Sequence, residues 1–208
     1  MSESLIEQYR GALSSGYLQQ DSGQLAVIER LQLLTDQFLA SQAAVPFYRR
    51  WFGRMSHVQG IYLWGGVGSG KTVLMDMFFE QLPSTKKVRT HFYRFMRRIH
   101  NELTRFQGIA NPLDKVAAEL ASQYEIICFD EFFVSDITDA MILAGILDGL
   151  FSRGVVLVAT SNVEPKDLYQ DGLQRGKFLP AIALLEKYNA VVKLESDIDY
   201  RLRALQSA

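Results

Sequence analysis

The fold of this chain is decided by one glycine-rich stretch, Gly65-Gly66-Val67-Gly68-Ser69-Gly70-Lys71-Thr72. The stretch fits the pattern G-x-x-x-x-G-K-[ST], in which backbone N–H groups surround the phosphates of a nucleotide. Lys71 is expected to reach the β- and γ-phosphate oxygens, and Thr72 to supply a hydroxyl to Mg²⁺. An apolar strand at 60–64 precedes the stretch, and a helix at 71–82 begins within it and ends before Pro83. The sequence therefore predicts a phosphate-binding loop with Mg²⁺ as cofactor.

Five short apolar runs alternate with helix-like segments after residue 59. They are expected to be strands at residues 60–64, 87–92, 125–130, 155–160 and 190–195. Strands that alternate with helices of about 10–20 residues form parallel sheets covered on both faces. The predicted fold class is therefore α/β, a P-loop NTPase with a five-stranded parallel sheet between helices.

The residues before the sheet are predicted to be helical. Apolar residues at helical spacing predict a helix over 21–41, and Asp21 with Gln24 resembles a capping box at its start. A shorter amphipathic helix is expected around Tyr9, and a connector at 42–59 follows the longer helix. We therefore expect a helical N-terminal segment with its connector over 1–58 and a P-loop core over 59–208.

Two adjacent carboxylates, Asp130 and Glu131, close the third predicted strand. Asp130 is expected to hold Mg²⁺ through its water shell, and Glu131 to orient the water that attacks the γ-phosphate. A carboxylate that handles water favours hydrolysis over phosphate transfer to an acceptor. Asn162 follows the fourth strand, where its amide is expected to hold the attacking water; a plain turn is the alternative.

The composition is that of an ordinary globular domain. Of 208 residues 48% are hydrophobic and 22% are charged, and the net charge of −1 provides no global field that would recruit nucleic acid or anionic lipid. The single cysteine, Cys128, lies in an apolar run, so a disulfide framework is excluded and a cytoplasmic location is expected. The sequence has no signal peptide pattern, no apolar run of about 18 residues and no spaced Cys/His cluster.

Longer motifs around these residues resemble the AFG-type AAA+ ATPases, a family of bacterial cell-division ATPases with mitochondrial relatives. The resemblance covers about residues 60–203, and the run after Asp130 is its most specific part. Its stretches are 62–68 with 74–76, 91–96, 128–140, 159–162, 172–175 with 178–182, and 199–203. The resemblance implies ATP as the nucleotide, and it places the Asn162 strand between the P-loop strand and the Asp130 strand. It also implies remodelling of a protein partner in cell division, with FtsZ as the target.

The same resemblance implies a homo-oligomer in which an arginine finger reaches a neighbour's γ-phosphate. Arg175 lies near the expected position, and Arg153, at the end of the preceding helix, is the rival. Either arginine also fits a helix end, where its charge balances the helix dipole. The family continues into a helical lid, whereas this sequence stops about thirteen residues after its last predicted strand. The lid is therefore expected to be absent, and no arginine can be assigned to it.

Two groups of side chains could contact a partner at the surface. Basic residues crowd a predicted helix and the strand before it: Lys86, Lys87, Arg89, Arg94, Arg97, Arg98 and Arg105. We expect this basic patch to face outward, where it fits nucleic acid, an acidic partner or simply solvent. Four aromatic residues lie in the connector: Phe47, Tyr48, Trp51 and Phe52. They fit a protein partner, a peripheral membrane contact or packing onto the core.

Three functions fit these residues. The first is an ATP-hydrolysing AAA+ remodeller, for which Glu131 and Asn162 are the discriminating pair. The second is a binding module that uses ATP to fix its shape, with little turnover. The third is a small P-loop kinase, for which the sequence offers no acceptor motif.

Overall fold

Five strands form one parallel sheet in the order β2-β3-β4-β1-β5. The computed structural model describes residues 4–43 and 58–195. The strands are β1 (Gly60–Trp64), β2 (Lys87–His91), β3 (Ile126–Asp130), β4 (Val156–Ser161) and β5 (Asn189–Lys193). Every predicted strand is therefore present, with ends that differ by no more than two residues. The order also confirms that β4 lies between β1 and β3.

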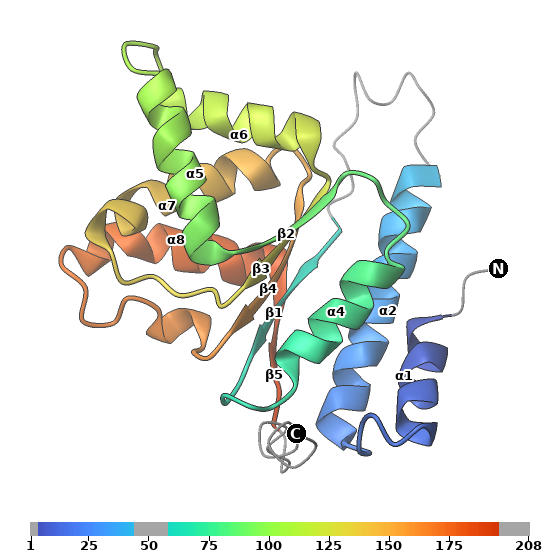
Figure 1. Ribbon diagram of the computed structural model, residues 1–208. Coiled ribbons are helices and arrows are strands. Elements are labelled where there is room, and N and C mark those ends of the chain that lie inside the picture. Colours follow the sequence, from blue (N-terminus) through green and yellow to red (C-terminus); the bar gives the residue numbers. More distant parts are fainter. Residues whose placement is uncertain (1–3, 44–57, 196–208) are drawn as a thin grey trace.

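Helices cover both faces of the sheet, as Figure 1 shows. On one face lie α1 (Leu5–Ser14), α2 (Ser22–Ala43) and α4 (Lys71–Gln81). On the other lie α5 (Phe92–Arg105), α6 (Pro112–Gln123), α7 (Ile137–Phe151) and α8 (Arg175–Tyr188), with the short 3-10 helix η1 (Pro165–Asp167) beside α8. The α/β fold with a parallel sheet between helices is confirmed.

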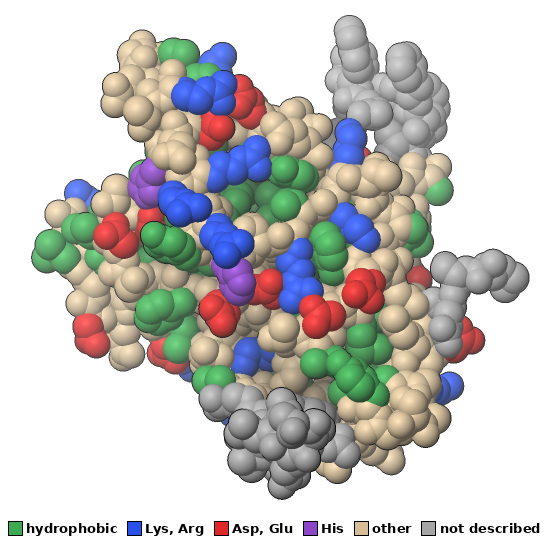
Figure 2. Space-filling model, viewed as in Figure 1, with side chains coloured by type: hydrophobic (Ala, Val, Ile, Leu, Met, Phe, Trp, Pro, Cys, Tyr) green, Lys and Arg blue, Asp and Glu red, His purple; other side chains and the backbone are tan. Residues whose placement is uncertain are grey.

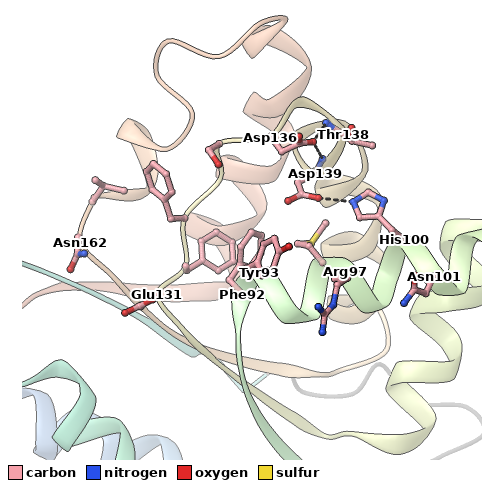
Figure 3. Close-up of a pocket in the computed structure, with 15 residues that line it drawn as sticks. Phe92, Tyr93, Arg97, His100, Asn101, Glu131, Asp136, Thr138, Asp139 and Asn162 are labelled. Atoms are coloured by element: carbon pink, nitrogen blue, oxygen red, sulfur yellow. Dashed lines mark hydrogen bonds and ion pairs between the residues drawn. The ribbon is translucent and has the colours of Figure 1, made fainter.

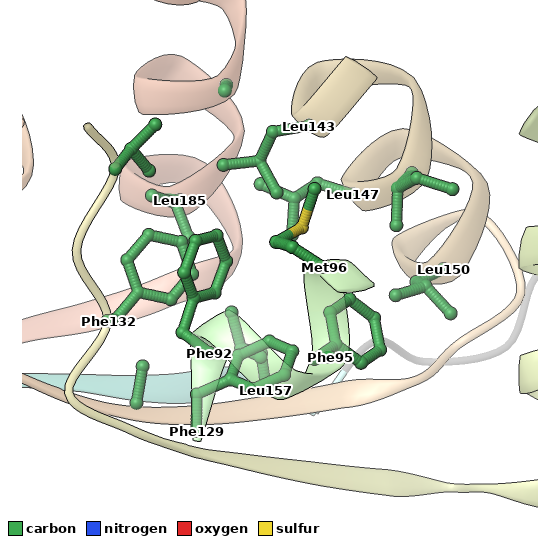
Figure 4. Close-up of a cluster of buried hydrophobic side chains, with 14 of the residues drawn as sticks. Phe92, Phe95, Met96, Phe129, Phe132, Leu143, Leu147, Leu150, Leu157 and Leu185 are labelled. Carbon is green, nitrogen blue, oxygen red and sulfur yellow. The ribbon is translucent and has the colours of Figure 1, made fainter. Parts of the chain in front are cut away.

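Alternation along the strands produces two separate cores. Ile61 and Leu63 pack under α1, α2 and α4, whereas Tyr62 between them packs under the four helices of the other face. Likewise Cys128 faces the first layer and Phe129 the second. Successive side chains of a strand point to opposite faces, so a strand buried on both sides is apolar throughout. Figure 4 shows the second core, in which the rings of Phe92 and Phe132 lie 4.3 Å apart.

The N-terminal helices complete the first core. Tyr9 of α1 and Ile28 and Leu31 of α2 are buried in it together with the apolar face of α4. Ser4 and Glu7 form a reciprocal capping box at the start of α1. The helical segment therefore forms one of the layers that cover the sheet, against the helix that follows the glycine-rich loop.

The predicted capping box of α2 is only half formed. The Asp21 carboxylate accepts the backbone N–H groups of Gly23 at 2.8 Å and Gln24 at 3.2 Å, as an N-cap does. The Gln24 side chain does not turn back to the cap. Its amide instead donates to the backbone oxygen of Ser69 at 3.2 Å, and its oxygen accepts from the Tyr9 hydroxyl at 3.4 Å. The second half of the prediction was wrong because a tertiary partner takes this amide.

The aromatic residues Phe47, Tyr48, Trp51 and Phe52 of the connector lie outside the described residues. Within 4–43 and 58–195, none of the helices has both the length and the apolar character that crossing a membrane requires.

Candidate active site

The glycine-rich loop joins β1 to α4 at the carboxyl edge of the sheet. Its first residue, Gly65, donates its N–H to the oxygen of Ser161 in β4 at 3.2 Å. A side chain at Gly65 would lie closer than 3.0 Å to the backbone oxygen of Leu194, just after β5. Gly68 and Gly70 have φ angles of 86° and 90°, a region that L-residues with side chains rarely adopt. The loop thus needs glycine for close packing at one position and for its turn at two others.

Lys71 is buried at the centre of this loop. Its Nζ atom donates to the backbone oxygens of Gly65 at 2.8 Å and Gly66 at 2.7 Å. Burial lowers the pKa of the Lys71 amine. The carbonyl oxygens hold the ammonium where the loop's backbone encloses it, and phosphate oxygens can take their place as acceptors. The role of Lys71 as a ligand of the β- and γ-phosphates stays a prediction.

The surroundings of the loop fit a triphosphate and its cation. Among the described residues, and apart from its two neighbours in the chain, no heavy atom lies within 4 Å of the position that a side chain at Gly66 would take, so the backbone there is open to a ligand. The first turn of α4 directs its N–H groups toward the loop, where a helix N-terminus attracts anions. The Thr72 hydroxyl is on an exposed residue of this turn, and hydroxyl and carboxylate oxygens are ligands that Mg²⁺ prefers.

The two carboxylates, predicted to bind Mg²⁺ and to handle water, diverge at the end of β3. Asp130 is the last residue of the strand, and Glu131 follows with a left-handed φ of 54°. Thr160 holds this turn: its hydroxyl accepts the N–H of Glu131 at 3.3 Å, and its backbone oxygen accepts that of Phe132 at 2.7 Å. A residue with a side chain in this region carries backbone strain, which folds keep mainly where function requires it. The turn leaves the Glu131 carboxylate exposed, 3.8 Å from Nδ1 of His91.

Arg89 of β2 binds Asp130 with two donors. Its Nε lies 2.8 Å from one carboxylate oxygen and its Nη2 3.1 Å from the other, while Nη1 binds the carboxylate of Asp76 on α4. Burial alone would lower the pKa of Arg89, but the hydrogen bonds and charges of these two carboxylates raise it, so the guanidinium stays charged. Asp76 lies one helical turn after Thr72, so both side chains project from the same face of α4. Arg89 thus shows that Asp130 faces the Thr72 side of that helix.

A cavity of about 1060 Å³ opens beside Glu131. Figure 3 shows Glu131 and Asn162 at one end of it, with α5 and the start of α7 forming the far walls. Phe92 and Phe132 line it as well, and the contact between His100 and Asp139, 2.6 Å long, closes the far end. The structure therefore brings the two predicted water-handling residues to one cavity.

The two candidate arginine fingers lie at opposite edges of the sheet. Arg175 is the first residue of α8, at the edge that carries the loop, and its Nη2 donates to the oxygen of Lys166 at 2.6 Å. Its Nε atom is buried without a partner among the described residues. Arg153 follows α7 at the amino edge of the sheet, where it binds Asp114 at 2.8 Å. Neither lines the cavity beside Glu131, so their role as fingers stays a prediction.

The basic patch predicted to face outward is only partly exposed. Arg89 points to Asp130 and Asp76, Lys87 donates to the backbone oxygen of Leu82 at 2.7 Å, and Arg98 donates to Tyr124 at 3.2 Å. The remaining members are exposed: Lys86, Arg94, Arg97 and Arg105. Figure 2 shows acidic side chains close to the basic ones on this face. The prediction was wrong for Lys87, Arg89 and Arg98, which are half-buried and have partners, whereas the other four residues do face outward.

Three contributors to the site were not predicted as such: Arg89, Thr160 and Gln24. Arg89 carries a signal that the strand pattern contains, because Lys87, Arg89 and His91 share one face of β2 at a spacing of two. For Thr160 and Gln24 the sequence offers no such signal. Their roles depend on the parallel register of β3 with β4 and on the packing of α2 beside the loop.

The fold and this site define the class of the protein: it is a P-loop NTPase with the strand order of the AAA+ proteins. The family model described as AFG1-like ATPase matches residues 3–208. The chain belongs to this AFG1-like ATPase family, a family of AAA+ proteins.

Two relatives support this membership. The chain is 44% identical to the cell division protein ZapE of Escherichia coli K12 over 213 residues, which cover 97% of this chain and 57% of that protein. It is 43% identical to lactation elevated protein 1 homolog B of Danio rerio over 161 residues, which cover 72% of this chain and 32% of that protein. The aligned residues thus span little more than half of the length of the first relative and about a third of the second.

Solved structures share the fold at low sequence identity. DnaI aligns with a TM-score of 0.57 at 16% identity, over 84% of both chains. AMPPCP-bound DnaA from Aquifex aeolicus aligns with a TM-score of 0.58 at 15% identity, over 89% of this chain and 51% of that one. These likenesses confirm the P-loop NTPase architecture.

Proposed function

We propose that this chain is a Mg²⁺-dependent ATPase that hydrolyses ATP to remodel a protein partner. The observation that carries the proposal is the shared cavity of Glu131 and Asn162, beside an Asp130 carboxylate that faces the P-loop helix. A nucleotide-binding protein without turnover has no need for such a pair. Membership of the AFG1-like family supports ATP as the nucleotide.

Each residue has one task in this mechanism. The backbone of the glycine-rich loop and Lys71 bind the β- and γ-phosphates, and the burial of Lys71 strengthens its attraction for them. Thr72 and Asp130 would hold Mg²⁺, which neutralises the charge that develops on the phosphate oxygens. Glu131 accepts a proton from the attacking water, and the Asn162 amide fixes the position of that water.

The rigid parts of the site are separated from the exposed ones. Asp130 is fixed by Arg89, and the backbone of Glu131 is fixed by Thr160. The Glu131 side chain itself is 81% exposed and free to turn toward a water molecule in the cavity. Positioning the backbone while leaving the carboxylate hydrated suits a base that exchanges protons with solvent in every cycle.

The proposal is tested by the fate of the γ-phosphate. With ATP labelled at that position, we expect the label to appear as inorganic phosphate, and only when Mg²⁺ is present. Tight ATP binding with no release of label identifies a binding module and contradicts the proposal. Label transferred to another molecule in place of water identifies a kinase and contradicts it as well.

The target and the assembly belong to the same proposal. The name of the bacterial relative, cell division protein, supports a partner in division, and we propose FtsZ on the resemblance of the motifs. We propose a homo-oligomer with Arg175 as the finger, because this arginine lies at the sheet edge that carries the loop. A cytoplasmic location is part of the proposal and is supported by the single, buried Cys128.

The finger is tested through the dependence of specific activity on protein concentration. A finger supplied in trans makes specific activity rise as the subunits assemble. Arg175→Ala is expected to abolish the rise and to lower activity by at least about 100-fold, since such fingers contribute about 10³–10⁵ in rate. Arg153→Ala is the control and should leave the rise unchanged. The opposite result assigns the finger to Arg153.

A further inference from the structure

Both oxygens of the Asp130 carboxylate already have a cationic partner. Arg89 donates to one oxygen at 2.8 Å and to the other at 3.1 Å, a two-pronged contact that fixes the plane of the carboxylate. The Asp130 side chain is only 14% exposed, so solvent screens this contact weakly. A metal ion that takes an oxygen of Asp130 must therefore share it with Arg89 or displace the arginine.

A third side chain, Asp76, makes this arrangement a potential metal site. Asp76 binds the remaining arm of the Arg89 guanidinium, so one positive charge lies between two carboxylates on separate elements. Without Arg89, two carboxylates would face each other across a single side chain's width. Such a pair of oxygen donors attracts divalent cations by itself.

We propose that Arg89 is a positioning residue that keeps divalent cations out of this carboxylate pair until a nucleotide brings them. The inference rests on the proposed function, because it takes Asp130 as the Mg²⁺ residue. The three side chains together carry a charge of −1, which holds a free cation weakly. The phosphates of ATP add several negative charges at the loop and arrive with Mg²⁺ bound. Their attraction for the cation then outweighs its repulsion by the guanidinium.

The contact also links two separate elements of the site. Asp130 ends a central strand, and Asp76 lies on the helix that begins in the phosphate-binding loop. Arg89 is the side chain that joins them, and its half-buried position on edge strand β2 keeps it in reach of both. A cation drawn to Asp130 by the nucleotide competes for the same oxygens, so binding of Mg·ATP is expected to loosen the hold of Arg89 on Asp130 and so weaken the link between β3 and α4.

The test measures Mn²⁺ binding to the whole protein without nucleotide, by the loss of the free-ion electron paramagnetic resonance signal. Wild type is expected to bind Mn²⁺ weakly. Arg89→Met is expected to bind it about tenfold tighter or more, because a nearby positive charge is removed from a divalent cation in a half-buried site. Adding Asp76→Asn to that variant should remove most of the gain. Arg98→Met is the matched control, since Arg98 contacts Tyr124 and Gln123 and should leave Mn²⁺ affinity unchanged.

The proposal is overturned if folded Arg89→Met binds Mn²⁺ no more tightly than wild type. A merely structural role of Arg89 predicts that result or a weaker site, whereas only a guarding role predicts a gain. If Arg89→Met does not fold, Arg89→Gln removes the charge but keeps a hydrogen-bond donor, and a gain above wild type is still expected. Equal Mn²⁺ affinity of wild type with and without ATP also overturns the proposal. Failure of wild type to bind ATP at all is a different result, which contradicts the proposed function.

Discussion

The exchange of Gly65 for alanine tests the packing of the phosphate-binding loop against the sheet. The added methyl would lie closer than 3.0 Å to the backbone oxygen of Leu194, a distance that real side chains essentially never show. The segment after β5 cannot move away freely, because the N–H of Leu194 donates to the backbone oxygen of Trp64 at 2.7 Å. The loop is held as well, since the N–H of Gly65 donates to the backbone oxygen of Ser161 at 3.2 Å. Either β5 moves away from β1 or the loop tilts out of place.

The cost of Gly65→Ala follows from this geometry. Forcing an extra methyl into a packed interior costs about 1–3 kcal/mol. For a chain of about 150–250 residues each kcal/mol lowers the melting temperature by about 2–4 °C, so a fall of about 2–12 °C is expected. Denaturant unfolding followed by circular dichroism gives the same quantity as a shift of the midpoint without a change in slope.

Gly66→Ala is the matched control one residue further along. Within 4–43 and 58–195, no heavy atom beyond its two chain neighbours lies within 4 Å of its added methyl, and alanine restricts the unfolded chain. Its stability is therefore expected to match wild type or to exceed it by about 0.4–1 kcal/mol. If the two variants unfold at the same denaturant concentration, the close approach of Gly65 to Leu194 is not as described and the reasoning fails.

Three further experiments test the packing of β3 and the hydrogen bonds that hold Glu131 and the phosphate-binding loop. Burial raises the pKa of the Cys128 thiol to about 12, so a disulfide reagent at pH 8 should leave it untouched in the folded protein and react once guanidinium unfolds the chain; rapid reaction of the folded protein would contradict its burial. Thr160→Val removes the oxygen that accepts the Glu131 N–H. The lost hydrogen bond of about 0.5–1.5 kcal/mol should lower the rate of phosphate release about 2- to 12-fold with ATP affinity unchanged. A rate equal to wild type would contradict the role of Thr160 in positioning Glu131. Gln24→Leu leaves the buried oxygen of Ser69 without its donor and should cost about 1–3 kcal/mol in denaturant unfolding, whereas no change would mean that α2 does not support the loop.

The sheet and the loop could be predicted because each depends on residues that are close together in the sequence. The glycines at 68 and 70 are required by the φ angles of their own residues, and the five strands are required by continuous apolar runs buried on both sides. Asp130 and Glu131 were found because two adjacent carboxylates end an apolar strand about sixty residues after the loop. The strand order came from the resemblance to a family, since apolar runs alone do not say which strands are neighbours.

The rest depends on contacts between distant segments. Arg89 was grouped with an outward basic patch because charge along the sequence does not report which face of an edge strand meets the core. Its real partners are 13 and 41 residues away, at Asp76 and Asp130. Gln24 likewise fits a cap by spacing, but a loop 45 residues further on takes its amide. Such choices follow from register and packing, which single-sequence patterns do not contain.

The central claim is tested most directly by the separation of ATP binding from ATP hydrolysis in Glu131→Gln. The side chain keeps its size and lies outside the loop, so the dissociation constant for Mg·ATP, measured by titration calorimetry, is expected to stay within about threefold of wild type, a difference of less than one hydrogen bond. Release of inorganic phosphate from the same samples should fall by at least about 100-fold, the contribution of a positioned base. Glu125→Gln, directly before the other end of the same strand, should behave as wild type in both assays. Undiminished phosphate release by Glu131→Gln would contradict the account.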